Sequence, residues 1–260
     1  MIYTMHKGNS LVVGEVDKIV SSYGKSLIQC ENSLDLEPLS VTPKMLSIVD
    51  ECNNEWERVG NVYFTRTNVK FAYGMKIIRN SGYFRTKNAL TYGGADFCLE
   101  CYSYIESVEN FASFISTQST LNTHEASRPG QFTIGTFGNH FYIGFYNSSG
   151  KGADYNDLGI DDIYYNLNHI ALCYTHHNTT VKIYLNGKLQ YTNTDFNVER
   201  LSRYIYVGAQ SYYPHDYNFT GTIDEVRISD GTCRYDSEFT PPDTRFIKDN
   251  KTLILLHCDY

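Results

Sequence analysis

The densest group of potential metal ligands lies in an acidic stretch near the middle of the chain. Asp154, Asp157, Asp161 and Asp162 all fall within residues 152–162. Calcium takes about six to eight oxygen ligands from carboxylates, amides and carbonyls, and a loop of this composition supplies several of them. The spacing does not fit an EF-hand, because the glutamate at the last position of that motif is missing. We predict either a calcium site in a rim loop or a solvated acidic loop, and no other cofactor.

A second candidate site is an aromatic segment, residues 211–219, between two predicted strands. It contains Tyr212, Tyr213, His215 and Tyr217. Loops between strands lie at the surface, where tyrosine rings can stack on sugars or anchor a protein interface. The alternative is that the rings fold back over the edge of a sheet. We predict that these four residues contact a ligand or partner.

Glycosidic hydrolysis needs two carboxylates aimed at one bond, about 5 Å apart in a retaining enzyme. Glu100 stands alone in its predicted strand, while Asp224 and Glu225 are adjacent and so face opposite sides of a strand. The carboxylates therefore predict a protein that is not an enzyme.

Two adjacent histidines, His176 and His177, lie in a predicted turn. This position favours a plain hairpin loop over a metal site.

The seven cysteines are scattered, and their number is odd. This usage predicts buried free thiols in a reducing compartment. Cys98 and Cys101 have the spacing of a redox or metal motif, but positions three apart in a strand face opposite sides, so we predict a structural role. The first eight residues lack the apolar stretch of a secretory signal, and we expect a protein that is not exported through one.

Composition excludes two classes of partner. The net charge is −7 and no basic run is present, so we expect no nucleic-acid partner. No apolar run approaches the ~20 residues of a membrane span, so we expect no membrane. Aromatic residues make up 15% of the chain, mostly tyrosine and phenylalanine, which favours strands.

Alternating apolar residues predict many short strands and very little helix. The clearest region is 169–191, in which Asn186-Gly187 supplies the two positive-φ positions of a type I′ hairpin turn. A long strand at 95–105 places Phe97, Leu99 and Cys101 on one face. Further strands are predicted at residues 61–65, 70–73, 131–135, 140–145, 203–208 and 221–228. One short helix is expected at 42–49, where proline follows a threonine N-cap.

Three of these segments carry a family resemblance. They are Asn-His-Ile-Ala-Leu at 168–172, Val-Lys-Ile-Tyr-Leu-Asn-Gly at 181–187 and Gly-Thr-Ile-Asp-Glu-Val-Arg-Ile-Ser at 221–229. They resemble successive strands of laminin-G-like, concanavalin A-like lectin/glucanase domains. Residues 231–242 are similar to the continuation seen in bacterial and phage members, and residues 96–101 to the family's Asp-Phe-Thr-Ile-Glu-Phe strand.

The resemblance implies an all-β protein, an antiparallel β-sandwich of the concanavalin A-like jelly-roll type with a short N-terminal appendage. We expect an arm or hairpin at residues 1–25 and the sandwich at residues 26–260. Retaining glucanases of this fold carry a Glu-x-Asp-x-x-Glu or similar strand motif, which this chain lacks. Tryptophans common in the family are replaced by Asn168 and Tyr102 at packing positions, so the fold should be kept.

The leading functional hypothesis is a bacteriophage virion protein, a structural or decoration component located on the particle. Its expected partners are other virion proteins and host or mucosal glycans, and the sequence is also compatible with a homo-oligomer. The alternatives are a freestanding bacterial lectin and a degenerate glycosidase.

Overall fold

The computed structural model describes residues 2–7, 10–15, 48–107, 109–118, 131–138, 140–146, 153–157, 163–194, 196, 198–210 and 217–258, and for 2–7, 10–15, 109–110, 145–146 and 153–157 it describes the backbone alone. The chain divides into two compact units, Met1–Ser47 and Ile48–Tyr260. In the first unit, β1 (Ile2–Lys7) and β2 (Ser10–Glu15) form an antiparallel hairpin. The predicted domain boundary at residue 26 and most of the predicted helix at 42–49 lie outside the described residues.

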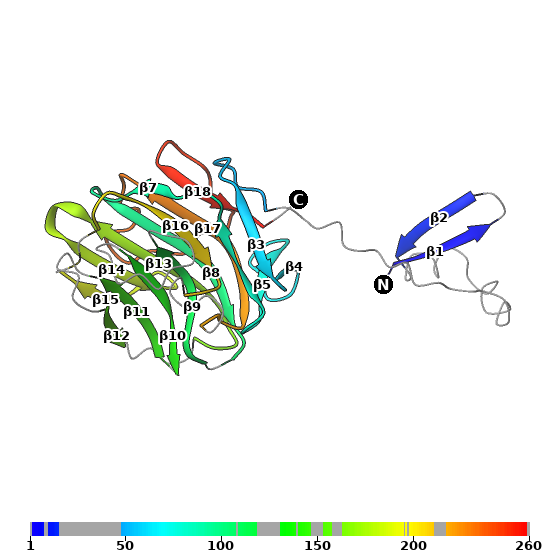
Figure 1. Cartoon of the computed structure of the whole chain (residues 1–260), viewed down its shortest axis with the longest axis horizontal. Coiled ribbons are helices and arrows are strands. Elements are labelled where there is room, and N and C mark those ends of the chain that lie inside the picture. Colours follow the sequence, from blue (N-terminus) through cyan, green and yellow to red (C-terminus); the bar gives the residue numbers. More distant parts are fainter. Residues whose placement is uncertain are drawn as a thin grey trace. The chain divides into compact units, whose positions relative to one another are not determined.

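In its described residues, the second unit is a sandwich of two antiparallel eight-stranded sheets (Figure 1). The back sheet has the order β15 (Lys188–Asn193), β14 (Thr180–Leu185), β13 (Leu167–Thr175), β8 (Phe97–Ile105), β17 (Gly221–Asp230), β5 (Gly74–Ile77), β4 (Tyr63–Thr65), with β18 (Thr252–Leu256) also paired to β17. The front sheet has the order β12 (Ala153–Asp157), β11 (His140–Tyr146), β10 (Phe132–Gly138), β9 (Glu109–Gln118), β16 (Leu201–Val207), β6 (Gly82–Thr86), β3 (Trp56–Gly60), with β7 (Leu90–Tyr92) also paired to β16.

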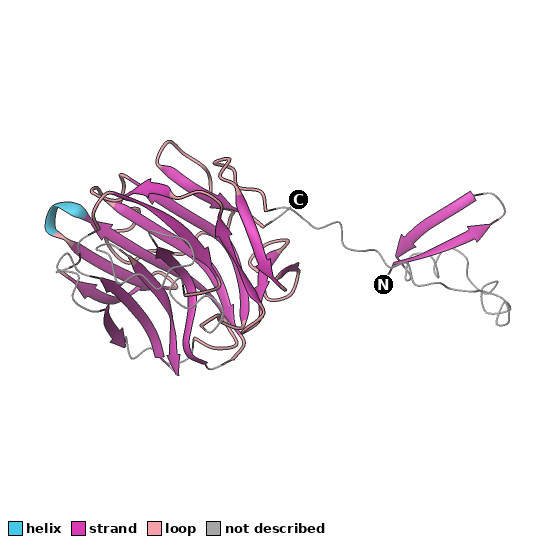
Figure 2. Cartoon of the chain, in the orientation of Figure 1, coloured by secondary structure: helices cyan, strands magenta, loops and turns pink. Residues whose placement is uncertain are grey.

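Helix is almost absent from the described part of the chain. It consists of a single 3₁₀ turn, His176–Asn178, between β13 and β14 (Figure 2). The two adjacent histidines thus lie in a hairpin connection, as predicted. No helix among the described residues has the length and apolarity needed to cross a membrane.

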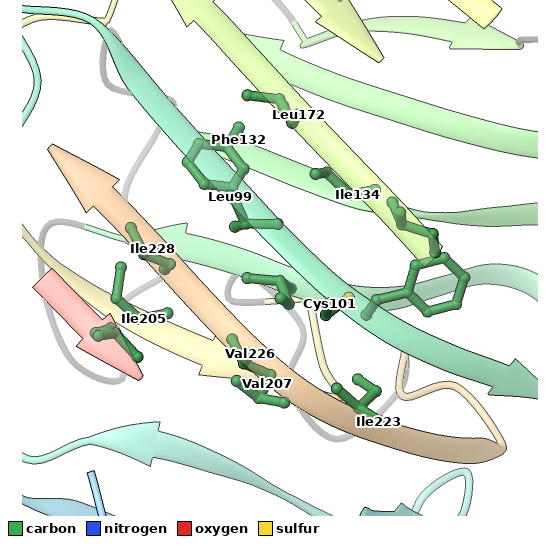
Figure 3. Close-up of a cluster of buried hydrophobic side chains, with 14 of the residues drawn as sticks. Leu99, Cys101, Phe132, Ile134, Leu172, Ile205, Val207, Ile223, Val226 and Ile228 are labelled. Carbon is green, nitrogen blue, oxygen red and sulfur yellow. The ribbon is translucent and has the colours of Figure 1, made fainter. Parts of the chain in front are cut away.

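The main core lies between the two sheets. Leu99 and Cys101 of β8 face inward with Val226 of β17, and they meet Ile134 of β10 and Val207 of β16 (Figure 3). Phe97 belongs to the same cluster, which confirms the predicted inward face of the long strand. Each fully buried aliphatic or aromatic side chain of this kind stabilises the fold by roughly 1.5–3 kcal/mol through removal of apolar area from water.

The outer face of the back sheet is covered by the segment after β17, residues 231–250, here called the tail. Phe239 of the tail stacks on Tyr235 with ring centroids 3.6 Å apart, and both rings pack against a small buried cluster that includes Cys98 and Tyr184. Further along the tail, Phe246 packs with Tyr102 of β8 in a second cluster. Cys98 and Cys101 thus lie on opposite sides of β8, as predicted.

The tail is also fixed to the turn between β14 and β15. Both turn residues have positive φ, 51° at Asn186 and 78° at Gly187, which confirms the predicted type I′ turn. The Phe239 amide donates to the Gly187 carbonyl at 3.0 Å. A Cβ atom at Gly187 would lie 1.8 Å from the Phe239 carbonyl oxygen, so the tail approaches the turn as closely as a glycine permits.

Two local predictions were wrong. Residues 70–73 are not a strand, because the Asp224 carboxylate accepts hydrogen bonds from the Lys70 and Phe71 amides and holds this segment outside the ladder. The strand, β5, begins at the next residue, Gly74. The acidic stretch was expected to be a loop throughout, but its residues 153–157 form β12, the last strand of the front sheet.

The contact between the turn and the tail can be tested with two glycines of equal φ. We expect Gly187→Ala to lower the free energy of unfolding by about 2–4 kcal/mol, because it combines the positive-φ penalty with a clash against backbone. Gly231 has the same φ of 78° but only the end of the Lys251 side chain nearby, so Gly231→Ala should cost about 1 kcal/mol. Urea unfolding measures both free energies. If the two variants lost the same free energy of unfolding, the tail would not be held at this turn.

Candidate functional site

The two outer faces of the sandwich differ in what covers them. On the back sheet, the fully buried carboxylate of Glu100 accepts hydrogen bonds from Arg227 at 2.6 and 2.8 Å and from the Tyr235 hydroxyl at 2.8 Å. His169 lies 3.2 Å from the same carboxylate. Since Tyr235 belongs to the tail, this network joins the tail to the sheet. The back face is therefore occupied by the chain itself, and the front sheet is the face left for a site.

The outer face of the front sheet carries hydroxyl groups where the inner face carries core residues. On β9, β10 and β11, core positions alternate with Ser113, Thr133 and Tyr142. The Ser113 hydroxyl lies 2.8 Å from that of Thr133 and 3.0 Å from that of Tyr142. Three hydroxyl-bearing side chains from three adjacent strands thus meet on one face.

An aromatic cluster lies beside these hydroxyls. It consists of Phe111, Phe137, Tyr142 and Tyr217, and we call it the front aromatic cluster. The Phe111 ring centroid lies 4.5 Å from that of Phe137, 5.6 Å from that of Tyr217 and 6.0 Å from that of Tyr142. Tyr142 is buried, Phe111 and Tyr217 are half-buried, and Phe137 is 42% exposed. Phe137 therefore presents ring surface to solvent, beside three buried side chains whose hydroxyls bond to one another.

Phe111 occupies its place through an irregular backbone. Its φ is 55°, a left-handed value that bulky residues rarely adopt. The register between β9 and β10 also shifts here, since Thr136 is opposite Ala112 whereas Gly138 is opposite Glu109. One extra residue on β9 makes this a β-bulge, a feature that re-aims side chains and recurs beside functional sites. Such a conformation costs of the order of 1–3 kcal/mol and persists only where its surroundings impose it.

The cluster includes one residue of the predicted aromatic site. Tyr217 packs on Phe111, and its carbonyl accepts a hydrogen bond from the Ser113 amide at 3.1 Å. Its neighbour Asn218 forms a parallel bridge with Ser113. The end of the 211–219 segment is thus fixed to β9. The other three predicted contacts, Tyr212, Tyr213 and His215, lie outside the described residues.

Sequence reasoning did not identify Phe111, Phe137 or Tyr142 as site residues. Tyr142 and the preceding Phe141 fall in a predicted strand, where a core role was the natural assumption. The available signal was the alternation of Phe141 and Ile143 with Tyr142, which places the tyrosine on the face away from the core.

The predicted calcium ligands are placed only in part. Asp154 and Asp157 lie on β12, opposite Phe145 and Tyr142 of β11 in the backbone register. Asp161 and Asp162 lie outside the described residues. Among the residues that the structure describes, no group of three or more His, Cys, Asp or Glu side chains could hold a metal ion. The calcium site therefore stays a prediction.

The carboxylates considered for catalysis are held separately. Burial raises the pKa of Asp224 to about 6, and its carboxylate accepts amide hydrogen bonds from Lys70 and Phe71. Glu225 is fully buried at a bulge in β17, accepts the Phe246 amide at 2.9 Å and lies 2.8 Å from His257 Nδ1.

Glu100 is ionised in spite of its position. Burial acts to raise its pKa, but the hydrogen bond with His169 and the charge of Arg227 more than offset this and hold the pKa below the ordinary value. Its partners are supplied by the protein itself, so this carboxylate stabilises the packing of tail on sheet.

Comparison with known proteins agrees with this architecture. The family model of the concanavalin A-like lectin/glucanases superfamily matches residues 79–235, so the chain belongs to that superfamily. No curated protein sequence gives a significant match.

Among solved structures, one similar domain is domain 4 of AbnA, a GH43 extracellular arabinanase from Geobacillus stearothermophilus, in complex with arabinotriose. The identity is 16%, the match covers 69% of this chain and 84% of that domain, and the TM-score is 0.51. Another is the binding domain of Paraclostridial Mosquitocidal Protein 1, with 10% identity, coverage of 72% of this chain and 45% of that chain, and a TM-score of 0.50. At these identities the likeness shows a shared fold, the β-sandwich of the concanavalin A-like superfamily.

The structural role assigned to Glu100 leads to a stability prediction. Glu100→Gln leaves the buried Arg227 without its counter-ion, so we expect the free energy of unfolding at neutral pH to fall by about 3 kcal/mol. Because the folded pKa of Glu100 is depressed, its contribution is complete above the ordinary carboxyl pKa and is lost as the pH falls through the folded value. The difference between wild type and variant should therefore narrow on acidification.

The control is Glu238→Gln, which removes the exposed partner of Lys188. An exposed pair of this kind contributes at most ~1 kcal/mol. Urea denaturation of both variants at several pH values is the measurement. A Glu100→Gln protein as stable as the control would contradict the structural role.

Proposed function

We propose that this protein is a non-catalytic glycan-binding module and that it works as a decoration or structural component of a bacteriophage particle. One observation carries the binding proposal, the front aromatic cluster with its exposed Phe137 ring.

The chemistry of the cluster suits a sugar. Aromatic rings offer an apolar face on which the C–H face of a pyranose or furanose can stack. The net charge of −7 disfavours polyanions, so the ligand class is a neutral oligosaccharide. The arabinanase domain that shares the fold was solved with arabinotriose, which supports a glycan as the ligand.

We propose that the protein is not catalytic because its candidate carboxylates are buried and bonded within the chain. Glu100, Asp224 and Glu225 are fully buried and are engaged by groups of the same chain. A general acid must reach the leaving-group oxygen, and a nucleophile must reach the anomeric carbon. Neither role suits a carboxylate that is enclosed under the tail or within a bulge.

Glycan binding can be tested with two aromatic residues of nearly equal exposure. After a glycan array has identified a neutral ligand, we expect Phe137→Ala to weaken its affinity about tenfold or more, equivalent to ~1.4 kcal/mol. Tyr63 of β4 is 43% exposed but lies on the last strand of the back sheet, so Tyr63→Ala should leave the affinity unchanged.

Calorimetric titration with the identified glycan gives the dissociation constants of the Phe137→Ala and Tyr63→Ala variants. An equal loss in the two variants, or an array with no neutral ligand, would contradict the proposed site. Tyr217→Ala, which removes the half-buried ring packed on Phe111, should give an intermediate loss.

Two observations support a place on a phage particle. All six cysteines among the described residues are free thiols, which suits a protein assembled in a reducing cytoplasm. Residues 231–242 resemble the continuation of bacterial and phage members of the family, and they form the start of the tail. The separate N-terminal unit would then attach the sandwich to other virion proteins.

The virion role predicts that the protein copurifies with particles. Antibodies raised against residues 48–260 should label purified phage in immunogold electron microscopy, and peptides of the chain should appear in mass spectra of the same particles. Labelling of the host cells alone, together with glycan binding, would instead favour the freestanding bacterial lectin.

A further inference from the structure

Three cysteines meet on the outer face of the back sheet. Cys98 of β8 lies directly opposite Cys173 of β13 in the antiparallel register, and their sulfur atoms are 3.2 Å apart. Cys233, at the start of the tail, packs against the same cluster. Three thiols separated by 75 and 60 residues in the sequence are thus neighbours in the fold, and we call them the thiol cluster.

The remaining described thiols lie in different surroundings. Cys101 and Cys258 are buried, and burial raises the pKa of both. Cys52 is half-buried like Cys233, but burial and the charge of Asp50 raise its pKa to about 11. The Cys52 thiol donates to the Thr252 carbonyl at 3.4 Å.

Cys233 is the thiol of the cluster that solvent reaches, since Cys98 and Cys173 are both about 1% exposed. A hydrogen bond with Cys173 lowers the pKa of Cys233 to about 7. A second hydrogen bond, with the Thr175 side chain, acts in the same direction, and burial acts against both. This shift favours the thiolate of Cys233, the form that reacts with oxidants.

We propose that the thiol cluster is an oxidation site, in which Cys233 reacts with a hydroperoxide and Cys173 converts the product into a disulfide. The proposal rests on the juxtaposition of the three sulfur atoms and is independent of glycan binding.

The chemistry balances in two steps. The Cys233 thiolate attacks the terminal oxygen of the hydroperoxide, the O–O bond breaks, and the alkoxide or hydroxide that leaves takes a proton from solvent. Cys233 is then a sulfenic acid. The Cys173 sulfur attacks the Cys233 sulfur, the S–O bond breaks, and the hydroxide leaves as water with the Cys173 proton. Two thiols lose two electrons, and the peroxide gains them.

The product would have a structural consequence. A disulfide between Cys173 and Cys233 ties the tail covalently to β13, in addition to its attachment through Glu100 and Tyr235. Cys98 is close enough to Cys173 for subsequent thiol–disulfide exchange, so Cys98→Ser isolates the first disulfide. The oxidised protein should therefore unfold at a higher urea concentration than the reduced protein.

The first experiment compares two thiols within the folded wild-type chain. With limiting iodoacetamide at pH 7.5, peptide mass spectrometry should find Cys233 alkylated at least tenfold faster than Cys52. Equal rates, or faster reaction at Cys52, would overturn the proposal.

The second experiment follows oxidation. With limiting hydrogen peroxide, Cys98→Ser should form the Cys173–Cys233 disulfide, and Cys52→Ser should do so at the wild-type rate. Cys173→Ser should retain a sulfenic acid on Cys233, which dimedone traps. Near-ultraviolet circular dichroism of each reduced variant shows that it is folded. Absence of both the disulfide and the dimedone adduct would overturn the proposal.

Discussion

The carboxylate of Glu100 is the group on which the arrangement of the back sheet depends. It lies in the middle of β8 and receives Arg227 from β17, His169 from β13 and Tyr235 from the tail. A buried carboxylate is tolerated only when its charge and lone pairs are matched. This requirement holds the first part of the tail in one position, and the stacked rings of Tyr235 and Phe239 then cover the apolar surface around it. The tail in turn brings Cys233 to Cys173 and occupies one outer face of the sandwich.

The front sheet is organised differently. Its strands alternate core residues with hydroxyl-bearing and aromatic residues, and a bulge in β9 places the Phe111 ring between Phe137 and Tyr217. The positive φ of Phe111 is a local cost that the surrounding ladder outweighs. The two sheets therefore differ in what lies on their outer faces. The tail covers the outer face of the back sheet, whereas the front sheet leaves the Phe137 ring exposed.

Membership of the concanavalin A-like lectin/glucanase superfamily is compatible with both binding and hydrolysis, since a fold does not by itself define a function. Whether a member of this fold can hydrolyse a glycan depends on whether its carboxylates can reach the scissile bond. In this chain the three carboxylates first considered for catalysis serve as internal acceptors for amides, guanidinium groups and a tyrosine hydroxyl. The aromatic surface, by contrast, is partly exposed.

The features that the sequence determined are those with a local physical cause. Period-two alternation identified β8, β13, β14 and β17, because successive strand residues face opposite sides of a sheet. The Asn186-Gly187 pair identified the hairpin turn, because both positions require positive φ. The same alternation predicted that Cys98 and Cys101 lie on opposite faces of their strand. The strand β12 escaped prediction because its polar residues gave no apolar stripe, and residues 70–73 were assigned to a strand because their hydrogen bonds to a distant aspartate are invisible in the sequence.

The tertiary structure decided which of these local elements meet. Tyr217 reaches Phe111, Tyr235 reaches Glu100, and Cys233 reaches Cys98 and Cys173 only through the order of strands in the two sheets and the return of the tail across one of them. Strand order and register depend on the burial of all the apolar stripes at once, and this long-range condition is not written in any single segment of the chain.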